Sequence, residues 1–200
     1  MQNFCRETKM KSDVIEVSSR EDRTETVLEM TKHVADYSGL SHKDSIYLRL
    51  LAEEMMGMMR AITGDVNGEF WIESGRDRVF ELHLLVSTKM DPQKREQLLR
   101  ASTTGRNEAN RGFMGKIRAF FDPLEDMSLL YDMTPDGLQM PVSWSMRAYR
   151  QQVRTSVEQN RKGAAEAWDE LERSVVAHVA DEVKVRIDGY EVEMTAIRQF

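Results

Sequence analysis

The chain has 200 residues, 40% of them hydrophobic, and a formal net charge of −6. This length can bury one full core, so a single domain over residues 1–200 is expected, and the acidic charge disfavours nucleic acid as a partner. The single cysteine, Cys5, excludes a disulfide scaffold. The sequence has no apolar run near the roughly 20 residues that cross a membrane and no signal-peptide core, so a cytoplasmic protein without a membrane partner is expected.

The first third of the chain predicts one strand and two helices. After a flexible leader over residues 1–12, the β-branched run Val14, Ile15 and Val17 predicts a strand. A helix is expected over about residues 21–38, ending at Gly39, with an inward face made of Val27, Met30, Val34 and Tyr37.

The second helix begins with a capping signal. Ser41, followed three residues later by Asp44, resembles a capping box and opens a helix that runs to Gly64. Its wide apolar face predicts burial on more than one side and consists of Ile46, Leu50, Leu51, Met55, Met58, Met59 and Ile62.

The remaining chain contains two hairpins separated by a helical region. Alternation at Phe80, Leu82, Leu84 and Val86 predicts an antiparallel hairpin with one face on the core. Residues 89–142 are expected to form a lid or insert with short helices, a mobile polar loop near Gly105 and an irregular proline-rich stretch. Helices broken near Gly163 follow, with Trp168, Leu171, Val175, Val176 and Val179 facing inward, before a terminal hairpin turns at Asp188.

This order of elements predicts the fold class. Strands that pair mainly as hairpins, together with helices grouped between them, favour an α+β fold. We expect a two-layer sandwich in which a mainly antiparallel sheet is covered by helices on one face.

One helix carries the clearest resemblance to a known family. The stretch LRLLAEEMMGMMRAI resembles the first motif helix of the histidine-kinase-like (GHKL, Bergerat-fold) ATPases, and within them the anti-sigma-factor serine kinases. That family pairs a glutamate base with an asparagine, four residues later, that holds magnesium. The resemblance therefore implies a catalytic role for Glu54 and a nucleotide contact for Glu53. The magnesium position holds Met58 or, counted from Glu53, Gly57, and neither supplies a hard oxygen ligand.

The end of the chain resembles the same family. From Ala180 to Thr195, an aspartate–glutamate–valine step leads from a helix into a hairpin, as in the anti-sigma kinases. The family's last helix begins with glycines that lie against the phosphates, whereas this chain has Leu171, Glu172 and Arg173 there.

Two weaker signals could still contact a nucleotide. Gly112 and Gly115 begin an expected helix beside Arg111 and Lys116, an arrangement that can bind phosphate, although two glycines three residues apart favour an ordinary loop-to-helix junction. Asp136 and Gly137 resemble a remnant of the family's adenine-reading box, although Pro135 equally favours a plain turn. The four histidines are in separate elements and lack the close carboxylate or cysteine spacing of a zinc site, so no metal is predicted; they are His33, His42, His83 and His178.

These patterns favour a degenerate regulator over an enzyme. The resemblance implies an anti-sigma-kinase-like domain that acts by binding another regulatory protein, or a second copy of itself, without a cofactor. The expected contacts are Met55, Met58 and Met59, if one side of their helix is exposed, and the loop near Gly105. The alternative is an active serine kinase or ATPase using Mg-ATP, Glu54 and a nonstandard magnesium ligand such as Asp91 or Asn107. A third hypothesis is a small ligand in the former nucleotide pocket.

Overall fold

A seven-stranded sheet forms the centre of the computed structural model, which describes residues 10–18, 23–63, 67–87, 142–188 and 191–200. Its order is β1–β3–β4–β7–β6–β5, with β2 also paired to β3, and the strand pairs are antiparallel. The strands are β1 (Met10–Lys11), β2 (Ile15–Ser18), β3 (Asn67–Ser74), β4 (Val79–Ser87), β5 (Val142–Ser145), β6 (Glu182–Asp188) and β7 (Glu191–Gln199). The expected α+β class with a mainly antiparallel sheet is confirmed.

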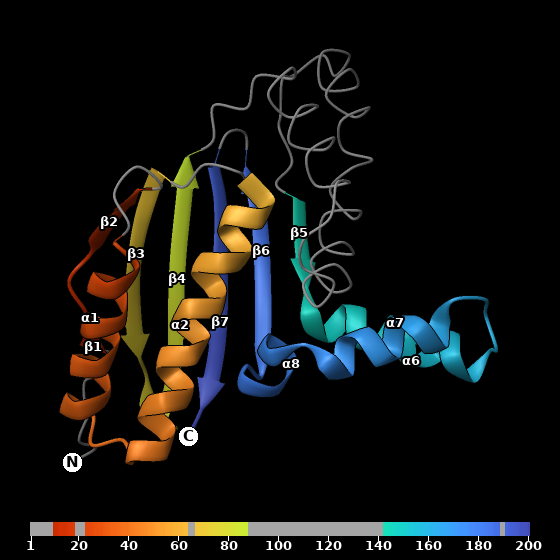
Figure 1. The fold of residues 1–200 in the computed structure, drawn as a ribbon, viewed down its shortest axis with the longest axis horizontal. Coiled ribbons are helices and arrows are strands. Elements are labelled where there is room, and N and C mark those ends of the chain that lie inside the picture. Colours follow the sequence, from red (N-terminus) through yellow and green to blue (C-terminus); the bar gives the residue numbers. More distant parts are fainter. Residues whose placement is uncertain (1–9, 19–22, 64–66, 88–141, 189–190) are drawn as a thin grey trace, which may run out of the picture.

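Helices α1 and α2 lie across one face of this sheet, and α6 and α7 pair with each other beyond β5 (Figure 1). The helical elements are α1 (Thr24–Tyr37), α2 (His42–Thr63), η1 (Arg76–Arg78), α6 (Met146–Glu158), α7 (Ala164–Arg173) and α8 (Val175–Val179). The short α8 packs against α2 and connects the α6–α7 pair to β6. The helices therefore divide into a layer on the sheet and an arm that projects from its edge.

Local sequence explains where the helices begin and end. The Ser41 hydroxyl accepts a hydrogen bond from the backbone N–H of Asp44 at 3.2 Å, which confirms the capping signal of α2. Gly39, with φ 65°, and Gly163, with φ 78°, adopt the left-handed backbone expected after α1 and before α7. The break predicted near Gly163 is confirmed.

The core lies between the sheet and the helix layer. Alternate residues of β4 and β7 are buried, as predicted for β4, because every second side chain points toward α1 and α2. Three residues expected to face inward are instead exposed: Tyr37 at 84%, Ile46 at 52% and Val175 at 43%. Other predicted inward positions, such as Val27, Leu51 and Val176, are buried, and the three exposed side chains lie at or near the ends of their helices, where the core no longer covers them.

Two edge strands were not predicted. Met10 and Lys11, which the sequence placed in the leader, pair with Ser74 and Glu73 of β3. Val142, expected at the end of the insert, begins β5, which pairs with β6. Strands this short carry too few residues for alternation to be visible in the sequence. The helices expected within residues 89–142, and the side chain of Ile62, lie outside the described part of the chain.

Candidate functional site

The motif helix α2 places its two glutamates at the border of the core. Glu54 is half-buried, whereas its neighbour Glu53 is exposed. Burial, and secondarily the nearby charge of Glu53, raise the pKa of the Glu54 carboxyl above its usual value. A raised pKa is one property of a general base.

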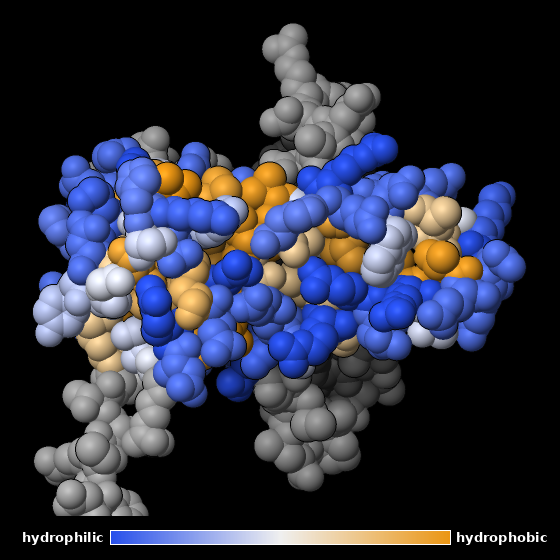
Figure 2. All heavy atoms as spheres, turned by 90° about the horizontal axis from the view of Figure 1, so that it is seen from below, coloured by the Kyte–Doolittle hydropathy of each residue, from blue (hydrophilic) through white to orange (hydrophobic). Residues whose placement is uncertain are grey.

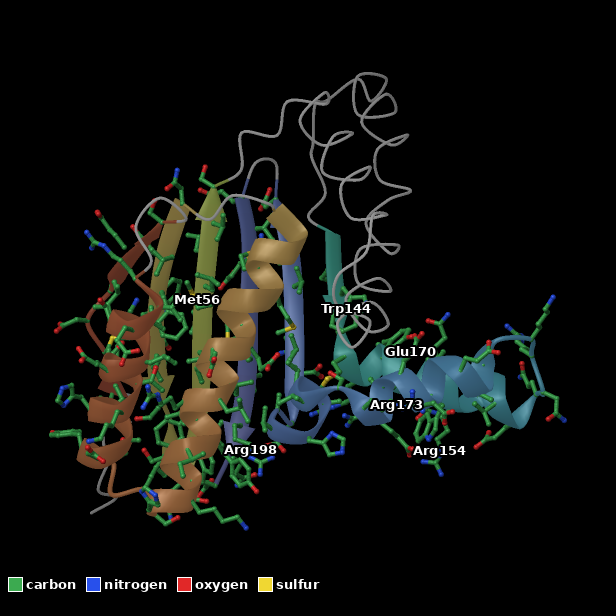
Figure 3. The ribbon with its side chains drawn as sticks, in the orientation of Figure 1. Met56, Trp144, Arg154, Glu170, Arg173 and Arg198 are labelled. Carbon is green, nitrogen blue, oxygen red and sulfur yellow. The ribbon has the colours of Figure 1, made fainter. Side chains whose placement is uncertain are left out.

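The residue four positions after Glu54 has a structural role. Met58 is 4% exposed and belongs to the apolar core, together with Met55, Met56 and Met59. These thioethers fill the space between α2 and its neighbours, and Met56 is labelled on the helix in Figure 3. Gly57 is exposed, with open space where a side chain would begin. Neither Met58 nor Gly57 offers an oxygen to magnesium.

The structure also changes the expected partner surface. Met55 and Met59 are fully buried and Met58 nearly so, so the condition that one side of this methionine cluster is exposed is not met. The wide apolar face of α2 is covered by the sheet on one side and by α1 and α8 on others. A partner would have to contact other side chains.

The remaining predicted site residues fall in the part of the chain that the structure does not describe. Gly105, Arg111, Gly112, Gly115, Lys116, Asp136 and Gly137, and the alternative magnesium ligands Asp91 and Asn107, lie outside the described residues. At the position of the family's phosphate glycines, Leu171 is a buried core residue. Glu172 accepts a hydrogen bond from the Trp168 indole at 2.7 Å. That turn of α7 therefore serves packing in this chain.

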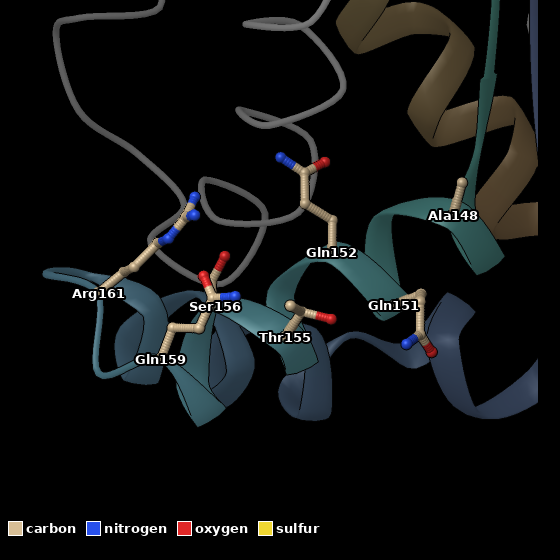
Figure 4. Close-up of a pocket in the computed structure, with 7 residues that line it drawn as sticks. All are labelled: Ala148, Gln151, Gln152, Thr155, Ser156, Gln159 and Arg161. Carbon is tan, nitrogen blue, oxygen red and sulfur yellow. The ribbon is translucent and has the colours of Figure 1, made fainter.

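The α6–α7 arm carries a surface hollow. A cavity of about 430 Å³ lies along α6 and is lined by Ala148, Gln151, Gln152, Thr155, Ser156, Gln159 and Arg161 (Figure 4). Its walls carry amide, hydroxyl and guanidinium groups, which can bind backbone and side-chain polar groups of a protein. Figure 3 shows Arg154, Glu170 and Arg173 along the same arm, away from the sheet. Sequence reasoning missed this hollow because its residues form no motif.

A second polar group lies on the sheet face opposite α1 and α2. Trp71 and His83 are directly paired across β3 and β4, and their rings stack at 4.8 Å with an interplanar angle of 2°. His83 also lies 3.6 Å from Glu81 and 3.5 Å from Glu193. The sequence shows no recognisable zinc-site spacing around His83, and it is the pairing of β4 with β7 that brings Glu193 beside it. Glu81 is two residues from His83, so strand alternation could have placed them on one face.

A buried carboxylate joins this same face to the arm. Glu182 on β6 is 5% exposed and accepts hydrogen bonds from the backbone N–H groups of Arg147 and Val183 at 3.1 and 3.0 Å. It also contacts Ser145, whose hydroxyl caps α6 by accepting from Ala148. The start of α6 is thereby fixed to the sheet.

Comparisons with protein-family models, with curated proteins and with solved structures gave no match to this chain. Among the described residues, no helix is long and apolar enough to cross a bilayer. Three places in the structure therefore bear on function: α2, the α6–α7 arm and the open face of the sheet.

Proposed function

We propose that this chain is a degenerate, anti-sigma-kinase-like regulatory domain that acts by binding another protein or a second copy of itself. The observation that supports this proposal best is the burial of Met58, which is 4% exposed at the position where the resemblance requires a magnesium ligand. A side chain committed to the core cannot turn outward to a phosphate-bound ion without leaving a cavity. The position has exchanged a coordination role for a packing role.

The α6–α7 arm supports a binding role. It projects past the sheet edge, so a partner can approach it without contacting the helix layer (Figure 1). Figure 2, which views the molecule from below, shows apolar patches among hydrophilic residues toward the arm. Val157 of α6 is 37% exposed and does not line the hollow, so it adds a separate apolar contact on another face of the helix. Exposed apolar side chains together with hydrogen-bonding groups are typical of protein-binding surfaces.

Nucleotide binding is tested by thermal unfolding with and without Mg-ATP. A ligand at 100 times its dissociation constant stabilises by roughly 2.7 kcal/mol, which a melting experiment detects easily. We expect no shift at millimolar Mg-ATP. A shift of that size would contradict the regulator proposal and favour catalysis.

Partner binding is tested by affinity capture from the native cell and by light scattering of the purified chain. We expect one partner, or self-association, that is lost on Thr155→Arg because a bulky cation then occupies the hollow. Glu29→Arg, at an exposed position of α1, is the matched control and should retain the partner. Failure of the unaltered chain to bind any protein, itself included, would overturn the proposal.

An active kinase is the second candidate, favoured by the raised pKa of Glu54. In that case Glu54→Gln should abolish ATP-dependent phosphate transfer while leaving ATP binding in place, because it removes the base and keeps the shape. Glu53→Gln is the control on the neighbouring exposed position. Absence of any ATP turnover by the unaltered chain removes this candidate.

A further inference from the structure

Three side chains of metal-ligand type converge on the open face of β3 and β4. Glu73 lies directly opposite Glu81, and His83 follows two residues later on the same face. One ligand atom from each of the three lies within 4.8 Å of the others. Glu73 accepts a hydrogen bond from the Trp71 indole N–H at 3.1 Å, and a cation shared by the two carboxylates would relieve their mutual repulsion across the strand pair.

His83 is held in one orientation. Its side chain is only 12% exposed and its ring stacks on Trp71. On one side of the ring, Nδ1 lies 3.5 Å from a Glu193 carboxylate oxygen and 3.4 Å from the Thr195 hydroxyl oxygen. A carboxylate at the second ring nitrogen is the arrangement that fixes the tautomer and orientation of a metal-binding histidine.

The other ring nitrogen faces the glutamates without a hydrogen bond. His83 Nε2 is buried and has no hydrogen-bond partner among the described residues. It lies 3.6 Å from Glu81 Oε2, which is too long for a hydrogen bond. Two ligands of a tetrahedral zinc ion, each bound at about 2.0–2.2 Å, are separated by about 3.4 Å. The gap therefore fits two ligands of one ion better than a donor and its acceptor.

We propose that Glu73, Glu81 and His83 bind one divalent transition-metal ion, with Glu193 orienting the imidazole. A nitrogen ligand beside two carboxylates selects zinc-like ions over magnesium and calcium, which take oxygen ligands. Three protein ligands leave one tetrahedral position for water. This site is separate from α2 and from the α6–α7 arm, so it does not depend on the regulatory proposal.

The ammonium of Lys11 is a cation that could compete with a metal ion for these carboxylates. It lies opposite Glu73 in register, with its ammonium 4.7 Å from the centre of the Trp71 ring. This ammonium is the alternative source of positive charge for the carboxylates. Lys11→Met should therefore tighten metal binding, because it removes a cation that repels the ion.

The test is calorimetric titration of the chelator-treated full chain with Zn²⁺. We expect one ion per chain, and binding at least about 10-fold weaker in Glu81→Gln, Glu73→Gln and His83→Gln. Glu69→Gln, on the same face of β3, and His33→Gln, exposed on α1, are the controls and should bind like the unaltered chain. Equal affinity in the cluster variants and the controls, or no binding at millimolar Zn²⁺, would overturn the proposal.

A spectroscopic readout locates the ion independently of affinity. Bound Co²⁺ should quench the fluorescence of Trp71, which stacks on the ligand His83. In Trp71→Phe the quenched component should vanish while Co²⁺ still binds. Because Glu81→Gln keeps the size of the side chain, its melting temperature without metal separates loss of the site from loss of the fold. Quenching that persists in Trp71→Phe would place the ion elsewhere and contradict the proposal.

Discussion

The two faces of the central sheet are built from the same strands and stabilised differently. On the face under α1 and α2, residues such as Phe70, Leu82 and Leu84 are completely buried. On the opposite face, Trp71 and His83 are partly buried by contact with each other and with side chains of neighbouring strands. Helices cover the first face, whereas lateral contacts between side chains protect the second.

This difference indicates what each face can do. The covered face gains stability from apolar area and tolerates no polar group without a partner. The open face keeps glutamates, a histidine and a tryptophan in fixed register while leaving them within reach of water and ions. Alternation along each strand therefore separates a packing surface from a chemical one.

The largest expected effect tests the packing surface directly. Leu84→Ala should lower the free energy of unfolding by about 2–5 kcal/mol, because it removes a fully buried side chain and leaves a cavity. Leu85→Ala, one residue along β4 on the open face, should cost about 1 kcal/mol or less. Urea unfolding of both variants measures the difference. Equal losses would show that the open face is also covered.

Glu182 lies on the open face of the sheet but is buried where α6 begins. Its carboxylate accepts hydrogen bonds from two backbone N–H groups and from Ser145. Glu182→Ala leaves these donors without their acceptor, and we expect a loss of about 1.5–3 kcal/mol in urea unfolding. Lys184→Ala, at the next outward position of β6 and exposed, should change stability by about 0.5 kcal/mol or less. A comparable loss in both variants would contradict the role of Glu182 in fixing the start of α6.

Strong periodic signals made most of this architecture predictable. The cap at Ser41, the stop at Gly39 and the alternation around Leu82 each depend on residues close in sequence, and each was confirmed. The edge strand β5 could not be predicted in this way, because its four residues form a strand only by pairing with β6.

The candidate sites were harder to predict than the fold. The apolar spacing of α2 predicted the burial of its methionines, whereas the idea of a methionine contact surface rested on residue type alone, since a thioether suits both core and surface. The convergence of Glu73 with Glu81 and His83 required the register of the β3–β4 hairpin, which the sequence shows only through its tight turn. The resemblance around Glu54 was visible because the two positions that it compares, Glu54 and Met58, lie four residues apart on one helix.

The smallest expected effect lies at the border of the covered layer, on Glu54. Its pKa is raised in the folded state, first by burial and then by Glu53, so folding is favoured by protonation of this carboxyl. The free-energy cost of holding an ionised Glu54 in the folded chain is absent below the unfolded-state pKa of 4.5 and grows as the pH rises through the folded-state pKa. Glu54→Gln should therefore stabilise the chain slightly at neutral pH and not at about pH 4, as measured by urea midpoints at both. Glu53→Gln should act in the same direction and more weakly, because charge repulsion is the second cause. A stabilisation by Glu54→Gln that is equal at both pH values would mean that packing, and not the carboxylate charge, sets the effect.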